Sequence, residues 1–347
     1  MAQPVISVDV MGGDHGSDVI LSGIEKVLVQ RSDARFLLFG DEQIVRPALT
    51  RRPRVESAST LTHCDMSIAM DAKPSVALRQ GRKVSSMWQA IAAVKSGAAQ
   101  ACISAGNTGA LMAMSKVVLR TLPGIERPAI VAVWPTIRGR SVVLDVGATI
   151  GGPASQYAQF AVMGAAYGRA IFNIPNPTIG LLNIGVEDVK GTDSVREAAD
   201  LLARSELNFT GFIEGDGIGR GDADVIVTDG FTGNIALKTA EGTARQIAEY
   251  LRQAMGGSVF SRLGYIFARS AFKNLRQRMD PAAANGGMFL GLNGIVVKSH
   301  GGADASGFAA AVALAVDVAD ADISQTIAAD IEKMQLLLDD AWAQTLD

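Results

Sequence analysis

The stretch that decides the fold is DVIVTDGFTGNIALKTAE, residues 224–241. Its apolar run Val225–Val227 predicts a buried strand, and an Asp-Gly pair at 229–230 ends that run. The residues that follow, Thr232–Asn234, introduce an apolar-periodic helix, which we expect to begin at Asn234. A loop that leaves a strand and opens a helix presents backbone N–H groups at the positive end of the helix dipole. The stretch therefore predicts either an anion site or an ordinary strand–turn–helix with an N-cap.

The same pattern recurs, because four further apolar strands end in glycine-rich polar loops. These loops are MGGDHG (11–16), SAGNTGA (104–110), NIGVEDVKGTD (183–193) and KSHGGADA (298–305). Ligands of open α/β sheets bind at the carboxyl ends of the strands, so we expect the five loops to converge. Their polar side chains include His15, Asn107, Lys190, Asn234, Lys298 and His300.

The order of the predicted elements indicates an α/β protein in which parallel strands carry helices on both faces. Hydrophobic residues make up 48% of the chain and aromatic residues only 5%, which suits an interior of Ala, Val, Ile and Leu. The 347 residues exceed the length at which one core usually stops growing. Since no linker or repeat divides the chain, we expect one domain, residues 1–347, with two lobes.

The sequence lacks the patterns of several common sites. The segment GDGIGRG (215–221) has glycine spacing like that of a dinucleotide loop, but an apolar strand follows it where that fingerprint requires a helix. We therefore expect a tight turn there. Cys64 and Cys102 show no CxxC spacing, and the loop carboxylates show no ligand spacing, so we expect no metal and no cofactor. A net charge of −3 argues against general nucleic-acid binding.

The N-terminus and the hydropathy indicate a cytoplasmic protein. The chain opens MAQPVISVDV, directly into a predicted strand and without the basic and apolar regions of a signal peptide. It has no run of about 18 apolar residues, so we expect no membrane-spanning helix.

Positive charge is segregated into two segments that contain no acidic residue. The first runs from Ala72 to Ile125 and has seven basic residues, and the second runs from Tyr250 to Met279 and has six. These two segments hold 13 of the 32 basic residues in a protein of net negative charge, which predicts an anionic partner. The alternative is that the basic residues only form a face exposed to solvent. Within the first segment, residues 70–87 are expected to form a basic connector.

Residues 258–278 predict a basic amphipathic helix within the segment 250–280. Its apolar face holds Val259, Phe260, Leu263, Ile266 and Phe267, and the adjoining face holds Arg262, Arg269, Lys273 and Arg276. This pattern is typical of a helix that lies in a membrane interface. A helix that packs in a dimer would show the same pattern, and both interpretations stay open.

Motifs along nearly the whole chain resemble the bacterial phosphate acyltransferases of phospholipid synthesis. In order they are VDVMGGDHG, DAKPSVALR, SSM, SAGNTGALMA, GIERPA, LDVGA, QFAVMG, GLLNIG, KGTD, VTDGFTGNIALKTAEG and GLNGIVVKSHG. The sequence departs from the family pattern at Thr149, where Asn is usual, and at Val186, where an acidic residue is usual. It also has HGGADA in place of the commoner HGSSDA.

The resemblance implies a three-layer αβα sandwich similar to the isocitrate/isopropylmalate dehydrogenase fold, working as a homodimer. It implies transfer of a long-chain acyl group from acyl carrier protein to inorganic phosphate, giving acyl-phosphate for glycerophospholipid synthesis. The product would pass to a membrane-bound glycerol-3-phosphate acyltransferase, so we expect a cytoplasmic enzyme peripherally associated with the inner face of the membrane.

Roles for individual residues follow from the resemblance together with the loop pattern. Lys190 is expected to bind phosphate and neutralise developing charge, and Asn234, with backbone N–H groups of residues 230–234, to stabilise the oxyanion. The candidates for phosphate or substrate binding are Asp14, His15, Asn107, Gly109, Asp229, Gly230, Thr232, Gly233 and His300. Those for carrier-protein docking are Lys73, Arg79, Arg82 and Lys83, and those for contact with an anionic membrane are Phe260, Leu263, Ile266 and Phe267.

Three other functions compete with this interpretation. A CoA-dependent phosphotransacylase on the same fold would share the chemistry but would leave the amphipathic segment 258–278 unexplained. A hydroxyacid dehydrogenase would need a nucleotide site that the sequence does not show. A non-enzymatic membrane scaffold would explain the basic helix but not five glycine-rich loops.

Overall fold

The computed structural model describes residues 3–258, 264–265, 267–270, 272, 286–320, 323 and 325–333. Its centre is one sheet of eleven strands in the order β3-β2-β1-β4-β11-β10-β5-β6-β9-β7-β8. The strands are β1 (Val5–Asp9), β2 (Arg35–Gly40), β3 (Ser59–His63), β4 (Ala101–Ser104), β5 (Ala129–Thr136), β6 (Gly139–Leu144), β7 (Ile179–Leu182), β8 (Phe209–Ile213), β9 (Val225–Val227), β10 (Gly287–Leu290) and β11 (Ile295–Lys298).

The sheet consists of two parallel halves that run in opposite directions. Strands β3, β2, β1, β4 and β11 are parallel to one another, and so are β6, β9, β7 and β8. Between the halves, the pairs β11–β10, β10–β5 and β5–β6 are all antiparallel. Three reversals in succession make β6 antiparallel in direction to β11. The predicted parallel pairing is therefore confirmed within each half but not across the centre.

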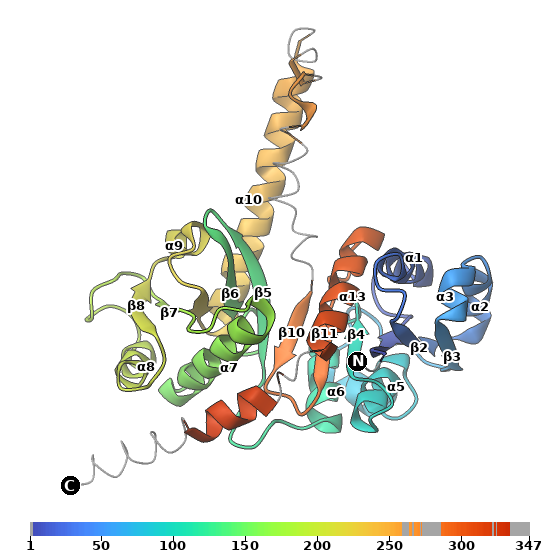
Figure 1. Cartoon of the computed structure of the whole chain (residues 1–347), viewed down its shortest axis with the longest axis horizontal. Helices are drawn as coiled ribbons and strands as arrows, with labels where there is room; N and C mark the ends of the chain where they lie inside the picture. The colour runs from blue at the N-terminus through green and yellow to red at the C-terminus, as the bar shows by residue number, and fades with distance from the viewer. Residues whose placement is uncertain are drawn as a thin grey trace.

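Helices cover both faces of the sheet, as Figure 1 shows. They are α1 (Ser17–Leu28), α2 (Glu42–Thr50), α3 (Pro53–Ser57), α4 (Pro74–Gly81), α5 (Ser86–Lys95), α6 (Thr108–Val118), α7 (Ala154–Phe172), α8 (Asp193–Ala203), α9 (Gly215–Arg220), α10 (Gly230–Gly256) and α13 (Ala305–Asp320). One apolar core includes residues of α1, α7, α8 and α13, and the other includes residues of α5, α6 and α9.

Neighbouring residues of one strand belong to different cores, because side chains alternate across a strand. Ile103 of β4 joins the first core and Cys102 joins the second. Strands covered on both faces read as continuous apolar runs, and all three residues of β9 are buried. The three-layer αβα architecture expected from the sequence is thus confirmed.

Several elements differ from the sequence-based expectations. Residues 50–70, whose sequence shows no clear periodicity, contain α3 and β3, and the basic connector 70–87 contains α4. The expected tight turn at 215–221 is the short helix α9, closed by Gly221 at φ 80°. Helix α10 begins at Gly230 instead of Asn234, because Asp229 caps it.

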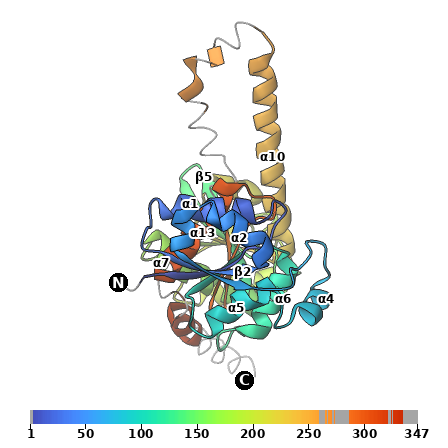
Figure 2. The ribbon, with the colours of Figure 1, turned by 90° about the vertical axis from the view of Figure 1, so that its right-hand side faces the viewer.

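Helix α10 projects away from the body of the molecule (Figures 1 and 2). Its 27 residues correspond to a length of about 40 Å at 1.5 Å per residue. Only Gly230 and Gly233, at its start, are buried. The rest of the helix is therefore held mainly by its root, where it leaves β9. Among the described residues, no helix is both long enough and apolar enough to cross a membrane.

Candidate active site

The loops of the first half follow three adjacent strands, β1, β4 and β11. At their carboxyl ends Asp9, Ser104 and Lys298 form one row, since Asp9 pairs in register with Ser104 and Ser104 with Lys298. The Asp9 carboxylate is buried and accepts hydrogen bonds from Ser86 Oγ and Ser104 Oγ, both at 2.7 Å. Burial raises the pKa of Asp9, while these hydrogen bonds oppose that rise. The row places a carboxylate and an ammonium directly beneath the loops.

Lys298 lies under the loops and ties two of them together. Its Nζ donates to the carbonyl of Ala105, at 3.3 Å, and to that of Ser299. Burial lowers the pKa of Lys298 to about 8, although Asp14 and Asp9 favour its charged form. The loop after β1 joins the same assembly, because the N–H of Asp14 donates to the carbonyl of Gly301 at 2.9 Å. The side chains of Asp14 and His15 are exposed above it.

In the second half, Asp145 follows β6 and holds the loop that comes after this strand. This buried carboxylate accepts hydrogen bonds from the N–H groups of Ile130, Gly147, Ala148 and Thr149 and from Thr149 Oγ1. Burial raises the pKa of Asp145 and the hydrogen bonds oppose the shift. The sequence offered only a buried Asp after a strand, a signal too common to identify this role.

Two glycines allow α10 to pack against the loop that Asp145 holds. A Cβ at Gly233 would lie 2.0 Å from the Asp145 carbonyl oxygen, and a Cβ at Gly230 would lie 2.5 Å from the Asp145 carboxylate. Thr149 Oγ1 accepts the N–H of Gly230 at 3.1 Å. Thr149, the residue that departs from the family pattern, therefore links the two segments. Gly230 and Gly233, which the sequence marked for substrate binding, are explained by close packing.

The backbone donors at the start of α10 already have acceptors within the chain. Asp229 Oδ1 accepts from the N–H groups of Phe231 and Thr232, Asp229 Oδ2 accepts from Thr232 Oγ1, and the Asp229 carbonyl accepts from the N–H of Gly233. The prediction that the N–H groups of residues 230–234 stand ready for an oxyanion is wrong for these donors. The helix does begin with the N-cap that the alternative interpretation of this stretch expected, and the capping residue is Asp229.

Lys190 and Asn234 are exposed on neighbouring segments of the second half. Asn234 lies on α10 beside Gly147, where a Cβ would be 3.8 Å from its side-chain amide carbon. Lys190 follows β7, which pairs directly with β9, the strand that leads into α10. Its loop is held by the N–H of Lys190, which donates to Glu187, and by Asn183 Nδ2, which donates to the carbonyl of Lys190. Their roles in catalysis stay predictions.

Helix α10 connects the two halves of the sheet. The expectation that all five loops share one edge of the sheet is wrong, because the strands of the two halves run in opposite directions. Lys238 Nζ lies 3.4 Å from Nε2 of His300, in the loop after β11, and 2.9 Å from Glu241. Burial lowers the pKa of His300 and the charge of Lys238 lowers it further. Sequence reasoning missed Lys238. Its spacing of four residues from Asn234, which places both on one helix face, could have identified it.

Asn107 and Gly109 have structural roles in this arrangement. Asn107 caps α6 by accepting the N–H of Ala110 at 2.9 Å, and its Nδ2 donates to the carbonyls of Met70 and Ala72. A Cβ at Gly109 would lie 2.7 Å from Pro74 Cγ, so this glycine lets α4 approach α6. The sequence placed both among the substrate contacts, but the contacts seen here are with residues 70–74.

The predicted docking residues lie together on one exposed element. Lys73 precedes α4, Arg79 lies on it, and Arg82 and Lys83 follow it, all exposed. Figure 2 shows α4 at the outer side of the molecule, next to α6. Of the four predicted membrane-contact residues, Phe260, Leu263 and Ile266 lie outside the described residues. Phe267 is described, and its exposed fraction is 85%.

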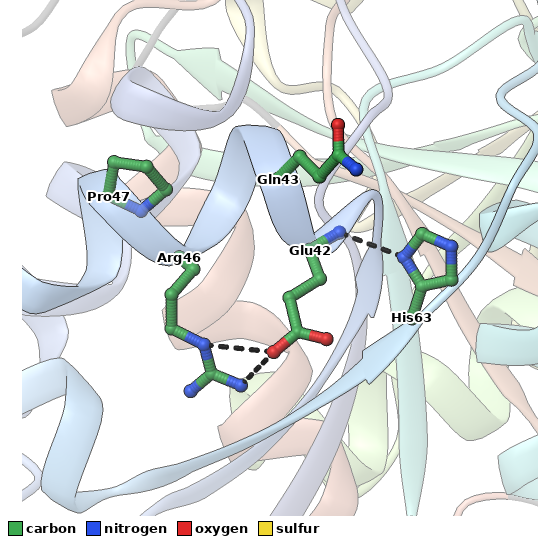
Figure 3. Close-up of a pocket in the computed structure, with 5 residues that line it drawn as sticks. All are labelled: Glu42, Gln43, Arg46, Pro47 and His63. Atoms are coloured by element: carbon green, nitrogen blue, oxygen red, sulfur yellow. Dashed lines mark hydrogen bonds and ion pairs between the residues drawn. The ribbon is translucent and has the colours of Figure 1, made fainter.

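A cavity of about 530 Å³ lies at the outer edge of the sheet, lined by Glu42, Gln43, Arg46, Pro47 and His63 (Figure 3). His63 Nδ1 accepts the N–H of Glu42 at 3.0 Å, and Glu42 pairs with Arg46. These residues belong to α2 and β3, and β2 separates β3 from the loop-bearing strand β1. The cavity is thus apart from the loops described above.

Known proteins resemble this chain in sequence and in fold. The model of the family described as "Fatty acid synthesis protein" matches residues 5–326. The phosphate acyltransferase of Parvibaculum lavamentivorans is 57% identical over 331 residues, covering 95% of this chain and 92% of the relative. A phosphotransacetylase from Streptococcus pyogenes has a similar fold, with a TM-score of 0.61 at 19% identity over 92% of this chain and 94% of its own.

A second solved structure supports the expected relation to the dehydrogenase folds. A protein described as a putative 4-hydroxythreonine-4-phosphate dehydrogenase from Salmonella typhimurium has a TM-score of 0.52 at 13% identity, covering 92% of this chain and 100% of its own. At such identities these structures show the fold alone. The family match and the sequence relative show more: the chain is an enzyme of the fatty acid synthesis protein family and belongs with the phosphate acyltransferases.

Proposed function

We propose that this enzyme transfers a long-chain acyl group from acyl carrier protein to inorganic phosphate and so supplies acyl-phosphate for glycerophospholipid synthesis. The observation that supports this best is the junction of α10 with the loop after β11. There Lys238 lies 3.4 Å from His300, Lys298 precedes His300 by two residues, and the exposed Asn234 lies four residues before Lys238 on the same helix. We also propose that residues 1–347 act as one catalytic domain with two lobes.

In the proposed reaction, phosphate is itself the nucleophile. An oxygen of HPO₄²⁻ attacks the thioester carbon, the C–S bond breaks, and the proton of the phosphate ends on the carrier's thiol. A protein thiol is not required, and burial raises the pKa of the Cys64 thiol to about 11 and that of Cys102 higher still. The tasks left to the protein are to hold the dianion near the thioester and to stabilise the oxyanion.

Lys190 and Asn234 are proposed for those two tasks. The Lys190 ammonium binds phosphate and offsets the charge that develops on it. The Asn234 side-chain amide donates to the oxyanion, without the backbone N–H groups that Asp229 and Thr149 already accept. Asp14, His15, Thr232 and His300 are proposed to border the substrates.

Proposed partners follow from charge and exposure. The exposed cations around α4 match an acidic carrier protein, so reversing Arg79, Arg82 and Lys83 to Glu should raise KM for acyl carrier protein about tenfold and weaken its dependence on salt. Exposed Ile247 and Tyr250 of α10 suit a homodimer contact, and Phe267 suits peripheral association with an anionic membrane. The membrane contact would keep the enzyme near a membrane-bound glycerol-3-phosphate acyltransferase on the cytoplasmic side.

The proposal is tested by incubating the enzyme with long-chain acyl carrier protein and phosphate and trapping acyl-phosphate as the hydroxamate. The expected result is hydroxamate that requires both substrates. A parallel incubation with short-chain acyl-CoA addresses the phosphotransacylase alternative, which the fold relationship to phosphotransacetylase keeps in view. Hydroxamate from acyl-CoA but not from acyl carrier protein would reject the proposed donor.

A further inference from the structure

One hydroxyl group links the loop after β6 to the start of α10. Thr149 Oγ1 accepts the N–H of Gly230 at 3.1 Å, and it donates to Asp145 Oδ2 at 2.9 Å. These directions are fixed, because a backbone N–H can only donate, which leaves the hydroxyl hydrogen for the carboxylate. The N–H of Thr149 donates to the same Oδ2 at 2.8 Å, and Thr149 and Asp145 are both buried. The hydroxyl is therefore held in one orientation between the two segments.

This hydroxyl also completes the N-terminus of α10. The first turn of a helix has backbone N–H groups that find no acceptor within the helix. Asp229 accepts those of Phe231 and Thr232, and Thr149 accepts that of Gly230. Because Gly230 is buried, its N–H would lose more than a surface group would if the hydroxyl were absent. The hydroxyl therefore favours one placement of the helix against the loop.

The root of α10 determines where the rest of this helix lies. Within its 27 residues, the buried ones are Gly230 and Gly233, and the helix leaves the body of the molecule directly after them (Figure 1). A second hydrogen bond joins the same two segments, from the N–H of Gly151 to Asp229 Oδ1. It is long, at 3.4 Å, and exposed, so we expect it to contribute less than the buried bond of Thr149.

Asn234 lies at this root, one helical turn after Gly230. A Cβ at Gly147 would lie 3.8 Å from Asn234 Cγ and 3.9 Å from Asn234 Oδ1, so the loop after β6 borders the amide. The N–H of Gly147 donates to Asp145 Oδ1 at 3.1 Å. Asp145 thus holds the loop beside Asn234, and Thr149 ties the helix that carries Asn234 to the same carboxylate.

We propose that Thr149 is a positioning residue for acyl transfer, whose hydroxyl sets where the Asn234 side-chain amide lies relative to the oxyanion. This proposal rests on the proposed function, in which Asn234 donates to the oxyanion, and deepens it. Misplacing a group by about 1 Å can lower a rate by about 10²-fold. Loss of the hydroxyl should affect kcat more than phosphate binding, because the charge on the oxyanion develops in the transition state.

The test compares Thr149→Val, which keeps the shape of the side chain without the hydroxyl, with Thr149→Ser, which keeps the hydroxyl. Thr178→Val is the matched control. Thr178 Oγ1 donates to Asp224 Oδ2 at 2.8 Å and accepts the N–H of Asp224 at 2.9 Å, so this variant loses the same kind of link. These two residues precede β7 and β9, at the amino ends of the strands and away from the loops that carry Lys190 and Asn234.

The kinetic readout separates positioning from a general loss of stability. Thr149→Val should lower kcat for acyl-phosphate formation about tenfold and change KM for phosphate less than about twofold. Thr149→Ala, which also lacks the hydroxyl, should do the same. Thr149→Ser and Thr178→Val should keep kcat within about twofold of wild type. In the Asn234→Ala background, Thr149→Val should change kcat less than about twofold, because the group that it positions is gone.

Three kinetic results would overturn the proposal. The first is a normal kcat in Thr149→Val when Asn234→Ala lowers kcat. The second is an equal loss of kcat in Thr149→Val and Thr178→Val. The third is the full loss from Thr149→Val in the Asn234→Ala background, which would show that Thr149 does not act through Asn234.

Hydrogen exchange gives a readout that does not depend on activity. The N–H of Gly230 should exchange at least about tenfold faster in Thr149→Val than in wild type or Thr149→Ser, because its acceptor is lost. Unchanged exchange would overturn the link between the hydroxyl and the helix. A normal kcat in Asn234→Ala would instead reject the proposed role of Asn234. Faster exchange in Thr149→Val would then show that the link itself is correct and that the proposed function is the part that fails.

Discussion

The loops of the two halves of the sheet look alike in sequence but are built differently. Those after β1, β4 and β11 are closed from below by the buried Asp9 and the partly buried Lys298, and their backbones bond to one another. Those after β6 and β9 meet around Asp145, the loop after β7 is held by its own hydrogen bonds, and the second half exposes Lys190 and Asn234. Glycine-rich loops therefore indicate where two segments of the chain approach each other closely. The side chains that remain exposed indicate where substrates can bind. We expect the following substitutions to separate residues that pack the loops from residues that meet the substrates.

The largest expected effect is on Lys190, which is exposed and has no packing role in this account. Lys190→Ala should lower kcat/KM by about 10²–10³, the usual scale for one preorganised contact to developing charge. The melting temperature should stay within about 2 °C of wild type, because exposed substitutions rarely cost more than about 0.5 kcal/mol. Steady-state kinetics and thermal unfolding measure the two quantities. Activity within twofold of wild type would remove Lys190 from the mechanism.

The next effect concerns packing, at Gly233 in the root of α10. Gly233→Ala should destabilise the protein by about 3 kcal/mol, because its Cβ would meet the Asp145 carbonyl oxygen. Gly242→Ala is the matched control in the same helix, where a Cβ would meet nothing within 4 Å. That change should be neutral or stabilise by up to about 1 kcal/mol, the difference in helix propensity. Equal urea midpoints for the two variants would show that the close approach at Gly233 is not required.

A smaller effect separates two asparagines near the starts of helices. Asn107→Ala should cost about 1–2 kcal/mol of stability, since it removes the cap of α6 and the bonds to Met70 and Ala72. Asn234→Ala should leave the melting temperature unchanged and lower kcat, because Asp229 already caps α10. The melting temperature and kcat of both variants show which asparagine stabilises its helix and which one acts in turnover. A stability loss at Asn234 with normal turnover would reverse the assignment.

More of the fold than of the candidate site could be predicted from the sequence. Apolar runs such as Val225–Val227 identified the buried strands, because strands covered on both faces leave a continuous signal. The edge strand β3 was missed, since Ser59–His63 is mostly exposed and its pattern is weak. The reversal of direction between the halves was also missed. It depends on β10, which follows the whole of the second half in sequence but pairs between β5 and β11.

For the site, the local sequence pattern identified the loops but not what each of their residues contacts. The N–H groups of residues 230–234 were expected to be free donors, yet the Asp229 carboxylate accepts those of Phe231 and Thr232. Lys238 was missed because its contact with His300 joins residues 62 positions apart. Such contacts depend on the direction in which α10 leaves the sheet, which no local pattern contains.

The central claim is that α10 combines loops of both halves into one active site. A double-mutant cycle between Lys190→Ala, in the second half, and His300→Ala, in the first, tests it directly through kcat/KM for acyl-phosphate formation. If both side chains act on the same bound phosphate, their effects should be non-additive, with a coupling energy of at least about 1 kcal/mol. Additivity within about 0.5 kcal/mol would show that the two residues act independently and would contradict the account.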